Sequence, residues 1–307
     1  MNWMKLRNLF GVIAVSIALF AACEENSNNP VNPGTDKPAK ITNLRANSAS
    51  ETSIRLNWDA STSATDTKFK GYRIRVSGGG PMAPIDVGGL AMPYTVTGLQ
   101  IGTEYTFSVT TVFLDGSTET ESDPVTIKWS PAWVFYNYGT GSEMRLYGSS
   151  SDLGSGIDLF NSEGKAANLT VAEGAEWDLG FYNREGMLLI GSPSKLLYNW
   201  GSITRKAVQI AVLGTGYADL KDIYDSQALN NSALNFNEGT VDLKNYTNNV
   251  ALVLRIPASG GKYNYAKVLV IRGANGFVQG SSPNEYIKIQ ASYQPTLDMP
   301  YAKVSVN

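Results

Sequence analysis

The sequence predicts an all-β protein built from two successive β-domains. From Pro38 onward, short stretches of alternating apolar and polar residues recur roughly every 8–12 residues, with turn-forming residues between them. Charged residues make up only 17 % of the chain, and its 30 glycines accompany many serines, threonines, tyrosines and valines, a composition typical of β-proteins. Residues 215–234 alone predict a helix, with Leu220, Ile223 and Tyr224 on one partly apolar face.

The N-terminus has the pattern of an export signal. Lys5 and Arg7 precede an apolar run over residues 9–22, which is too short to span a membrane as a helix and ends at Cys23, the single cysteine. This arrangement resembles the bacterial lipoprotein signal, although Phe20 stands where that signal usually has leucine. The resemblance implies lipidation of Cys23. The alternative is an ordinary signal peptide with an incidental cysteine.

The lipoprotein resemblance divides the first part of the chain in two. Residues 1–22 would be removed, and residues 23–37, which contain two prolines and no apolar periodicity, would form a flexible tether. Two glutamates follow the cysteine and resemble the short acidic signals of Bacteroidota surface lipoproteins. We therefore expect a protein anchored by lipid to the outer membrane or cell surface.

Trp58 and Tyr72 stand in two of the short strands predicted within residues 38–129, and the segment from Leu99 to Tyr105 follows them. In this order they resemble two core aromatics and the tyrosine corner of the fibronectin type III domain, a β-sandwich of the immunoglobulin-like class, with Ile101 in place of the usual proline. We expect the Tyr105 hydroxyl to bond back across this corner. The domain contains no Arg-Gly-Asp triplet, so its expected role is that of a spacer or packing platform.

Three segments within residues 130–307 carry a resemblance: Trp177–Phe181, Val270–Gly276 and Tyr286–Gln290. They resemble motifs of the HmuY family of exported haem-binding lipoproteins, and the hairpin after the second is longer than the family pattern. The resemblance implies a mostly antiparallel β-domain that holds haem between two axial histidines, or methionines in some relatives. Independently, Asn275-Gly276 is a strong two-residue hairpin signal.

The chain contains no histidine. This excludes Ser-His-Asp catalysis, the HExxH zinc site and bis-histidine haem ligation. Haem is therefore a candidate cofactor only through other residues, and no metal site is predicted. The candidate ligand-binding residues are Met187, Trp200, Arg255, Tyr263 and Tyr265.

These candidates have competing structural explanations. Met187 is expected to be a core residue more than a metal ligand. Tyr263 or Tyr265 could bind haem iron as tyrosinate, and the alternative is that both are exposed tyrosines on a strand. Trp200, beside Asn199 and Gly201, is expected to be an exposed aromatic.

Catalytic chemistry has little support in the sequence. Glu176 and Asp178 could form the carboxylate pair of a glycosidase, but Asp178 belongs to the HmuY-like structural motif. Asp219, Asp222 and Asp225 lack the loop pattern of a calcium site. We therefore predict no catalytic residues and a protein that is not an enzyme.

The predicted function is ligand capture at the cell surface. The C-terminal domain would bind haem or another flat, apolar compound, with the fibronectin-like domain as a spacer. The alternative is a carbohydrate- or protein-binding surface module without haem activity. Besides the membrane, the expected partners are haem, a glycan or a surface protein, and the net charge of −2 argues against nucleic acid.

Overall fold

The computed structural model describes residues 37–89, 91–135, 143–224 and 233–301. Residues 37–307 form one compact unit, distinct from residues 1–36. Cys23, the signal segment and nearly all of the tether lie outside the described residues, so their predicted roles stay predictions. The described part is all-β, as the sequence predicts. Within it, no helix is long and apolar enough to cross a membrane.

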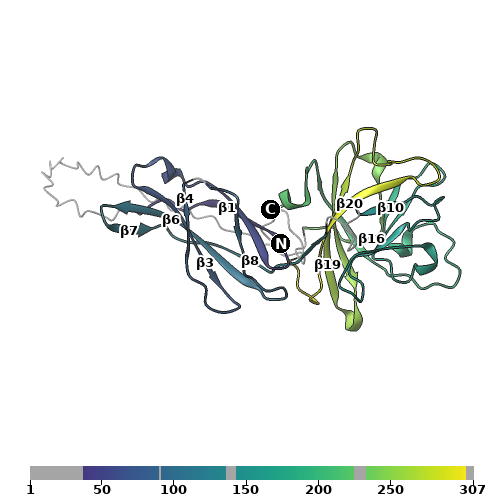
Figure 1. Cartoon of the computed structure of the whole chain (residues 1–307), viewed down its shortest axis with the longest axis horizontal. Coiled ribbons are helices and arrows are strands. Elements are labelled where there is room, and N and C mark those ends of the chain that lie inside the picture. Colours follow the sequence, from purple (N-terminus) through teal and green to yellow (C-terminus); the bar gives the residue numbers. More distant parts are fainter. Residues whose placement is uncertain (1–36, 90, 136–142, 225–232, 302–307) are drawn as a thin grey trace, which may run out of the picture. The chain divides into compact units, whose positions relative to one another are not determined.

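The N-terminal domain, residues 38–129, contains two antiparallel sheets (Figure 1). The first sheet has the order β1-β2-β5, with strands Thr42–Ser50, Ser53–Asp59 and Tyr94–Val96. The second has the order β4-β3-β6-β7, with β8 also paired to β6. Its strands are β3 Phe69–Ser77, β4 Ile85–Gly88, β6 Tyr105–Asp115, β7 Thr118–Glu121 and β8 Val125–Trp129.

The predicted aromatic core of this domain is confirmed. Trp58 and Tyr72 are 2 % and 1 % exposed, and their rings meet edge to face with centroids 5.4 Å apart. The Tyr72 hydroxyl accepts a hydrogen bond from the backbone N–H of Ser61 at 3.2 Å. Each ring thus fills the core, and the polar group of Tyr72 is satisfied at the edge of the domain.

The tyrosine corner also forms as predicted. The backbone N–H of Gln100 donates to the Tyr105 hydroxyl at 2.9 Å, while the Tyr105 ring and Leu99 are buried. Residue 101, isoleucine here, lies in a turn. The corner therefore depends on the hydroxyl contact and not on a proline in the turn.

The C-terminal domain, described over residues 130–301, contains a larger and a smaller antiparallel sheet. The larger sheet has the order β10-β20-β19-β18-β15-β16, with β9 also paired to β20 (Figure 1). In chain order its strands are β9 Trp133–Phe135, β10 Arg145–Tyr147, β15 Gln209–Thr215, β16 Asn237–Glu238, β18 Val250–Pro257, β19 Tyr263–Ile271 and β20 Tyr286–Gln294.

The smaller sheet has the order β12-β11-β13-β14-β17. Its strands are β11 Gly156–Asp158, β12 Ala167–Leu169, β13 Leu179–Tyr182, β14 Leu189–Gly191 and β17 Thr240–Asp242. Short 3-10 turns complete the described elements: η1 Thr62–Thr65, η2 Val171–Glu173, η3 Pro193–Lys195, η4 Leu220–Asp222, η5 Leu243–Asn245 and η6 Ser259–Gly261.

The main core lies between these two sheets, and the central strand β18 is buried on both of its faces. Val250, Leu252 and Leu254 point into the main core, whereas Ala251 and Val253 contact separate clusters on the outer face of the larger sheet. This explains why the β18 sequence is almost continuously apolar instead of alternating. The outer face of β18 is therefore covered by these two clusters.

The predicted helix over residues 215–234 is wrong for the part that the structure describes. Only the single turn η4 forms, with the Asp219 carboxylate accepting from the Lys221 N–H, and the chain is extended again at Ile223. The Leu220 and Lys221 carbonyls, which a helix would use internally, instead accept hydrogen bonds from the Asn47 side chain at 3.3 and 2.9 Å. Residues 225–232 lie outside the described residues.

The predicted Asn275-Gly276 hairpin is displaced by one residue. Gly273 and Gly276 form the closing pair, with Gly273 N–H donating to the Gly276 carbonyl at 2.8 Å, so the two turn residues are Ala274 and Asn275. Gly276 has φ of 130°, as its place after the turn requires. This extended hairpin leaves the Ile271 end of β19, opposite the end that carries Tyr263, and its Phe277 packs into the main core.

A buried lysine joins the two domains. Lys267, on the outer face of β19, is fully buried, and its ammonium donates to the Asn47 side-chain oxygen and to the Ile223 carbonyl, the latter at 3.3 Å. Asn47 lies on β1 of the N-terminal domain. The same amide therefore connects β1, η4 and β19.

The C-terminal end of the described chain returns to the N-terminal domain. Tyr301 packs against Trp129 with ring centroids 5.5 Å apart, and its hydroxyl donates to the Glu104 carboxylate at 2.7 Å. Trp129 in turn donates from its indole nitrogen to the Ser48 hydroxyl at 3.1 Å. The N-terminal domain thus serves as a packing platform for the C-terminal domain within this compact unit.

We predict that Tyr105→Phe destabilises the protein by about 1–2 kcal/mol, because the Gln100 N–H loses its acceptor at a partly buried corner. Urea unfolding of the full chain would measure this. Tyr94→Phe is the matched control, since no described residue bonds the Tyr94 hydroxyl, and it should change stability much less. Equal losses in the two variants would contradict the role given to the corner.

We predict that Asn47→Ala costs about 2–3 kcal/mol, because the buried Lys267 ammonium loses an acceptor and two η4 carbonyls lose a donor. Asn57→Ala on the neighbouring strand β2 serves as the control. The double variant Asn47→Ala/Lys267→Met should lose less stability than the sum of the losses in the two single variants, because it contains no buried charge that lacks an acceptor. Additive losses in urea unfolding would contradict a coupled pair.

Candidate functional site

Three of the five predicted ligand-binding residues come together on the outer face of the larger sheet. Arg255 on β18 pairs with Tyr265 on β19, and Tyr263 lies two residues away on the same face. The Arg255 guanidinium lies over the Phe236 ring, 3.9 Å from its centroid, and the Tyr265 ring is 6 % exposed. Two of the three side chains thus contact protein groups closely.

Tyrosinate ligation at Tyr265 is disfavoured by its surroundings. Burial raises the pKa of the Tyr265 phenol, and the nearby Arg255 charge only partly opposes this effect. The phenol therefore stays protonated at neutral pH. The description of Tyr265 as an exposed strand tyrosine is also wrong, because the Leu234 and Val253 side chains pack in the same cluster.

The prediction that Trp200 is exposed is wrong. It is 4 % exposed and packs edge to face with Trp177 and Tyr198, at centroid distances of 5.0 and 5.3 Å. Its ring lies directly over Gly174, where any Cβ would come within 2.0 Å of it. The neighbouring Asn199 and Gly201 suggested a surface loop, but the space above Gly174 accommodates the indole. Met187 is partly buried against the same cluster, as its packing explanation predicted.

The two carboxylates considered for glycosidase chemistry do not form a catalytic pair. Asp178 is buried, where it accepts from Lys206 at 2.8 Å and from the Leu159 N–H at 2.9 Å, while Glu176 is exposed. Burial raises the pKa of Asp178, and the Lys206 ammonium opposes that shift. Burial alone would lower the pKa of Lys206, but the Asp178 charge raises it. The pair therefore functions as an internal ion pair.

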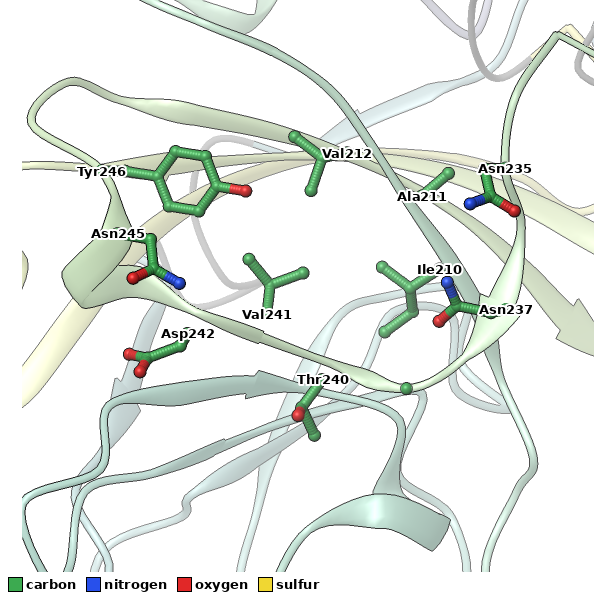
Figure 2. A pocket seen from close by; sticks show the side chains of 11 residues that line it. Ile210, Ala211, Val212, Asn235, Asn237, Thr240, Val241, Asp242, Asn245 and Tyr246 are labelled. Carbon is green, nitrogen blue, oxygen red and sulfur yellow. The ribbon is translucent and has the colours of Figure 1, made fainter.

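A pocket of about 400 Å³ opens where the two sheets of the C-terminal domain diverge. The chain leaves the edge of the larger sheet at β16, crosses through Gly239 and joins the edge of the smaller sheet at β17. The pocket lies in this fork and is bounded by β15, β17 and η5 (Figure 2). Its volume is in the range of small-molecule sites.

Polar side chains stand on opposite sides of this pocket. Figure 2 shows Asn235 and Asn237 on one side and Asp242 and Asn245 on the other. The three asparagines are exposed, and within the described part of the chain their side-chain amides make no hydrogen bond. One Asp242 oxygen accepts from the Lys244 N–H at 3.0 Å and caps η5. Amide donors and acceptors are thus available to a ligand from both sides.

An apolar strip lies between these polar sides. Ile210, Val241 and Tyr246 belong to or pack against the main core, and Val212 is 37 % exposed. In Figure 2 the Val241 side chain and the Tyr246 hydroxyl point toward the open space. A ligand that fits this site has hydroxyl or amide groups at its periphery and carbon–hydrogen surface between them.

The pocket offers little for metal or covalent chemistry. Asp242 is the one carboxylate among its lining residues. Across the described ranges, no group of three or more Cys, Asp or Glu side chains is placed to hold a metal ion.

Reasoning from sequence missed these lining residues. They fall in the segment NFNEGTVDLKNY over residues 235–246, which reads as a polar connection. The available signal was the recurrence of asparagine beside aromatic residues, but nothing in the sequence shows that this connection crosses from one sheet to the other.

Comparison with known proteins identifies the N-terminal domain. Residues 38–131 match the fibronectin type III domain family. The chain contains a fibronectin type III domain. This domain type is a non-enzymatic binding or spacer module, and the match covers the predicted sandwich.

One curated relative is the receptor-type tyrosine-protein phosphatase eta of Gallus gallus, 36 % identical over 101 residues. The alignment covers 33 % of this chain and only 7 % of the phosphatase. One similar solved structure is a two-domain fibronectin type III segment of chicken tenascin, which is 14 % identical with a TM-score of 0.25. The match covers 82 % of this chain and 98 % of the tenascin segment. A structure described as a myokine covers 31 % of this chain and 99 % of its own, at 19 % identity and a TM-score of 0.24.

We predict that Asp178→Asn destabilises the protein by about 2 kcal/mol, because Lys206 loses its carboxylate in a mostly buried setting. The asparagine oxygen can still accept from the Leu159 N–H, but its NH2 group cannot accept from Lys206. Glu176→Gln is the control and should change stability much less, since Lys206 bonds the backbone carbonyl of Glu176 and the exposed Glu176 side chain acts on it only through its charge. Urea unfolding at pH 7 measures both, and a stable Asp178→Asn variant would refute the assignment.

Proposed function

We propose that this protein is a lipid-anchored carbohydrate-binding protein of the cell surface, with its ligand site in the pocket between β15 and β17. The observation that carries the proposal is the set of unbonded asparagine amides on two sides of an apolar strip. Sugars present the same combination, with hydroxyl groups at the ring edge and carbon–hydrogen surface on the ring face. The exposed asparagine amides can form hydrogen bonds with such hydroxyl groups, while the apolar strip contacts the ring face.

The aromatic residue of the pocket supports this chemistry. Tyr246 is half-buried at the end of η5, and its ring and hydroxyl are both available to the open space (Figure 2). A tyrosine in this position contributes an apolar ring to pack against a sugar and a polar tip to bond it. Asp242 adds an acceptor, since only one of its oxygens caps η5.

The HmuY-like haem proposal has weaker support. Haem needs an iron ligand and a mostly apolar slot, whereas the pocket is lined by three asparagines and an aspartate. Among the residues predicted for haem, Tyr265 and Trp200 are buried and Arg255 stacks on Phe236. The alternative of a carbohydrate-binding module is thus favoured over haem capture.

The fibronectin type III domain has a supporting role in this proposal. Its strand β1 contacts η4 and β19 through Asn47, on the outer face of the sheet that contributes β15 to the pocket. The predicted anchor at Cys23 and the tether to residue 37 would attach the unit to the membrane. The domain then holds the larger sheet in place instead of binding the ligand itself.

We predict that the mature chain retains one or more oligosaccharides on a glycan array. Calorimetry with a retained glycan should then show about fivefold weaker binding for Asn237→Ala and for Asn245→Ala, the loss of roughly one hydrogen bond each. Tyr246→Phe should weaken binding about fivefold because the hydroxyl bond is lost, and Tyr246→Ala should weaken it further because the ring is lost as well. Asn57→Ala, in the fibronectin type III domain, is the control.

Two results would contradict this function. One is an array without any bound glycan. The other is binding that the pocket variants leave unchanged, which would place the glycan elsewhere. A haem titration runs in parallel, and a saturable Soret shift that Tyr263→Phe abolishes and Asn237→Ala does not would support the family-based alternative.

A further inference from the structure

A second hollow of about 210 Å³ lies beside the same chain segments that form the carbohydrate pocket. It is formed by three connections of the larger sheet: the segment that follows β15, the segment that precedes β18 and the residue that follows β19. The lining residues are Gly216, Tyr217, Ala218, Thr247, Asn248, Asn249 and Arg272.

Asn249 fixes the walls of this hollow. Its side-chain oxygen accepts from the Arg272 N–H at 2.7 Å, and its side-chain amide donates to the Tyr217 carbonyl at 2.8 Å. Its backbone carbonyl accepts from the Gly216 N–H at 2.9 Å. One residue therefore holds the three segments together, and the hollow is a built feature of the sheet end.

Arg272 gives the hollow its charge. One of its terminal nitrogens donates to the Gly273 carbonyl at 3.4 Å, and it forms no ion pair with any residue that the structure describes. A guanidinium has five N–H donors in a planar fork, so most of its hydrogen-bonding capacity is available. No carboxylate lines the hollow, whereas the side chains of Thr247 and Asn248 are exposed beside it. This combination suits an oxyanion.

The two hollows adjoin along the chain. Tyr246 lines the first and Thr247, the next residue, lines the second. On the opposite wall, Val212 and Gly216 are four positions apart, or about 13 Å of extended chain.

We infer that the hollow at Arg272 is an anion subsite, and that the glycan recognised by the neighbouring pocket carries a carboxylate or sulfate group. This inference rests on the proposed function and specifies its ligand class as acidic glycans. The guanidinium pairs with the two oxygens of the acidic group, and Thr247 and Asn248 complete the hydrogen bonding.

The test is calorimetry with the full mature chain and three matched probes: an oligogalacturonate, its methyl ester, and a sulfated neutral galacto-oligosaccharide. The acidic oligogalacturonate should bind about ten- to a hundredfold more tightly than its ester, the contribution of a charge-assisted hydrogen bond. Tighter binding of the sulfated probe instead would identify sulfate as the natural group. In either case binding weakens as salt concentration rises.

Variants separate this inference from the proposed function. Arg272→Gln should remove the preference for the acidic probe and leave binding of the ester unchanged, and Arg272→Lys should restore part of the preference. Lys262→Gln, at the far end of β19, is the matched loss of a surface charge and should change nothing.

Equal affinities of the acidic and neutral probes for the wild-type chain would overturn the anion subsite alone, with carbohydrate binding intact. A preference that Arg272→Gln retains would overturn it as well. If neither these probes nor any glycan on the array binds, both the subsite and the proposed function are refuted.

Discussion

A buried ammonium group determines how the described unit is assembled. Removing a lysine charge from water costs several kcal/mol, so Lys267 requires acceptors wherever it is placed. The structure supplies them from the Asn47 side chain and the Ile223 backbone, which belong to the N-terminal domain and to the segment after η4. The outer face of the larger sheet is therefore linked to both β1 and the segment after η4 through one side chain.

This constraint also explains where a ligand can bind. The inner face of the larger sheet packs on the smaller sheet, and its outer face is covered by β1, η4 and the cluster around Leu234 and Tyr265. Among the described residues, the two hollows lie outside these covered faces. One lies at the sheet edge where β16 leads into β17, and the other at the sheet end where the connections around Asn249 meet. Their lining is polar because it consists largely of edge and connecting residues.

The sequence predicted best the features whose signals are local. Trp58, Tyr72 and Tyr105 stand at family-specific positions in a regular sandwich, and the structure places all three in the core. The predicted helix around Leu220 was wrong because its apolar spacing also suits a single turn, whose carbonyls bond to Asn47, a residue 173 positions away. The prediction that Trp200 is exposed was wrong for a similar reason, since the space above Gly174 is formed only by the folded chain. The pocket could not be predicted, because its asparagines resemble those of any exposed connection.

The contact between Tyr301 and Trp129 has a consequence for the order in which the chain folds. The chain is synthesised from its N-terminus, so the strands of the fibronectin type III domain can pair before the rest of the chain is made. Yet the cluster around Trp129 is complete only when Tyr301, a residue from far along the chain, packs into it. The core of the domain made first is thus completed by a side chain that is made much later.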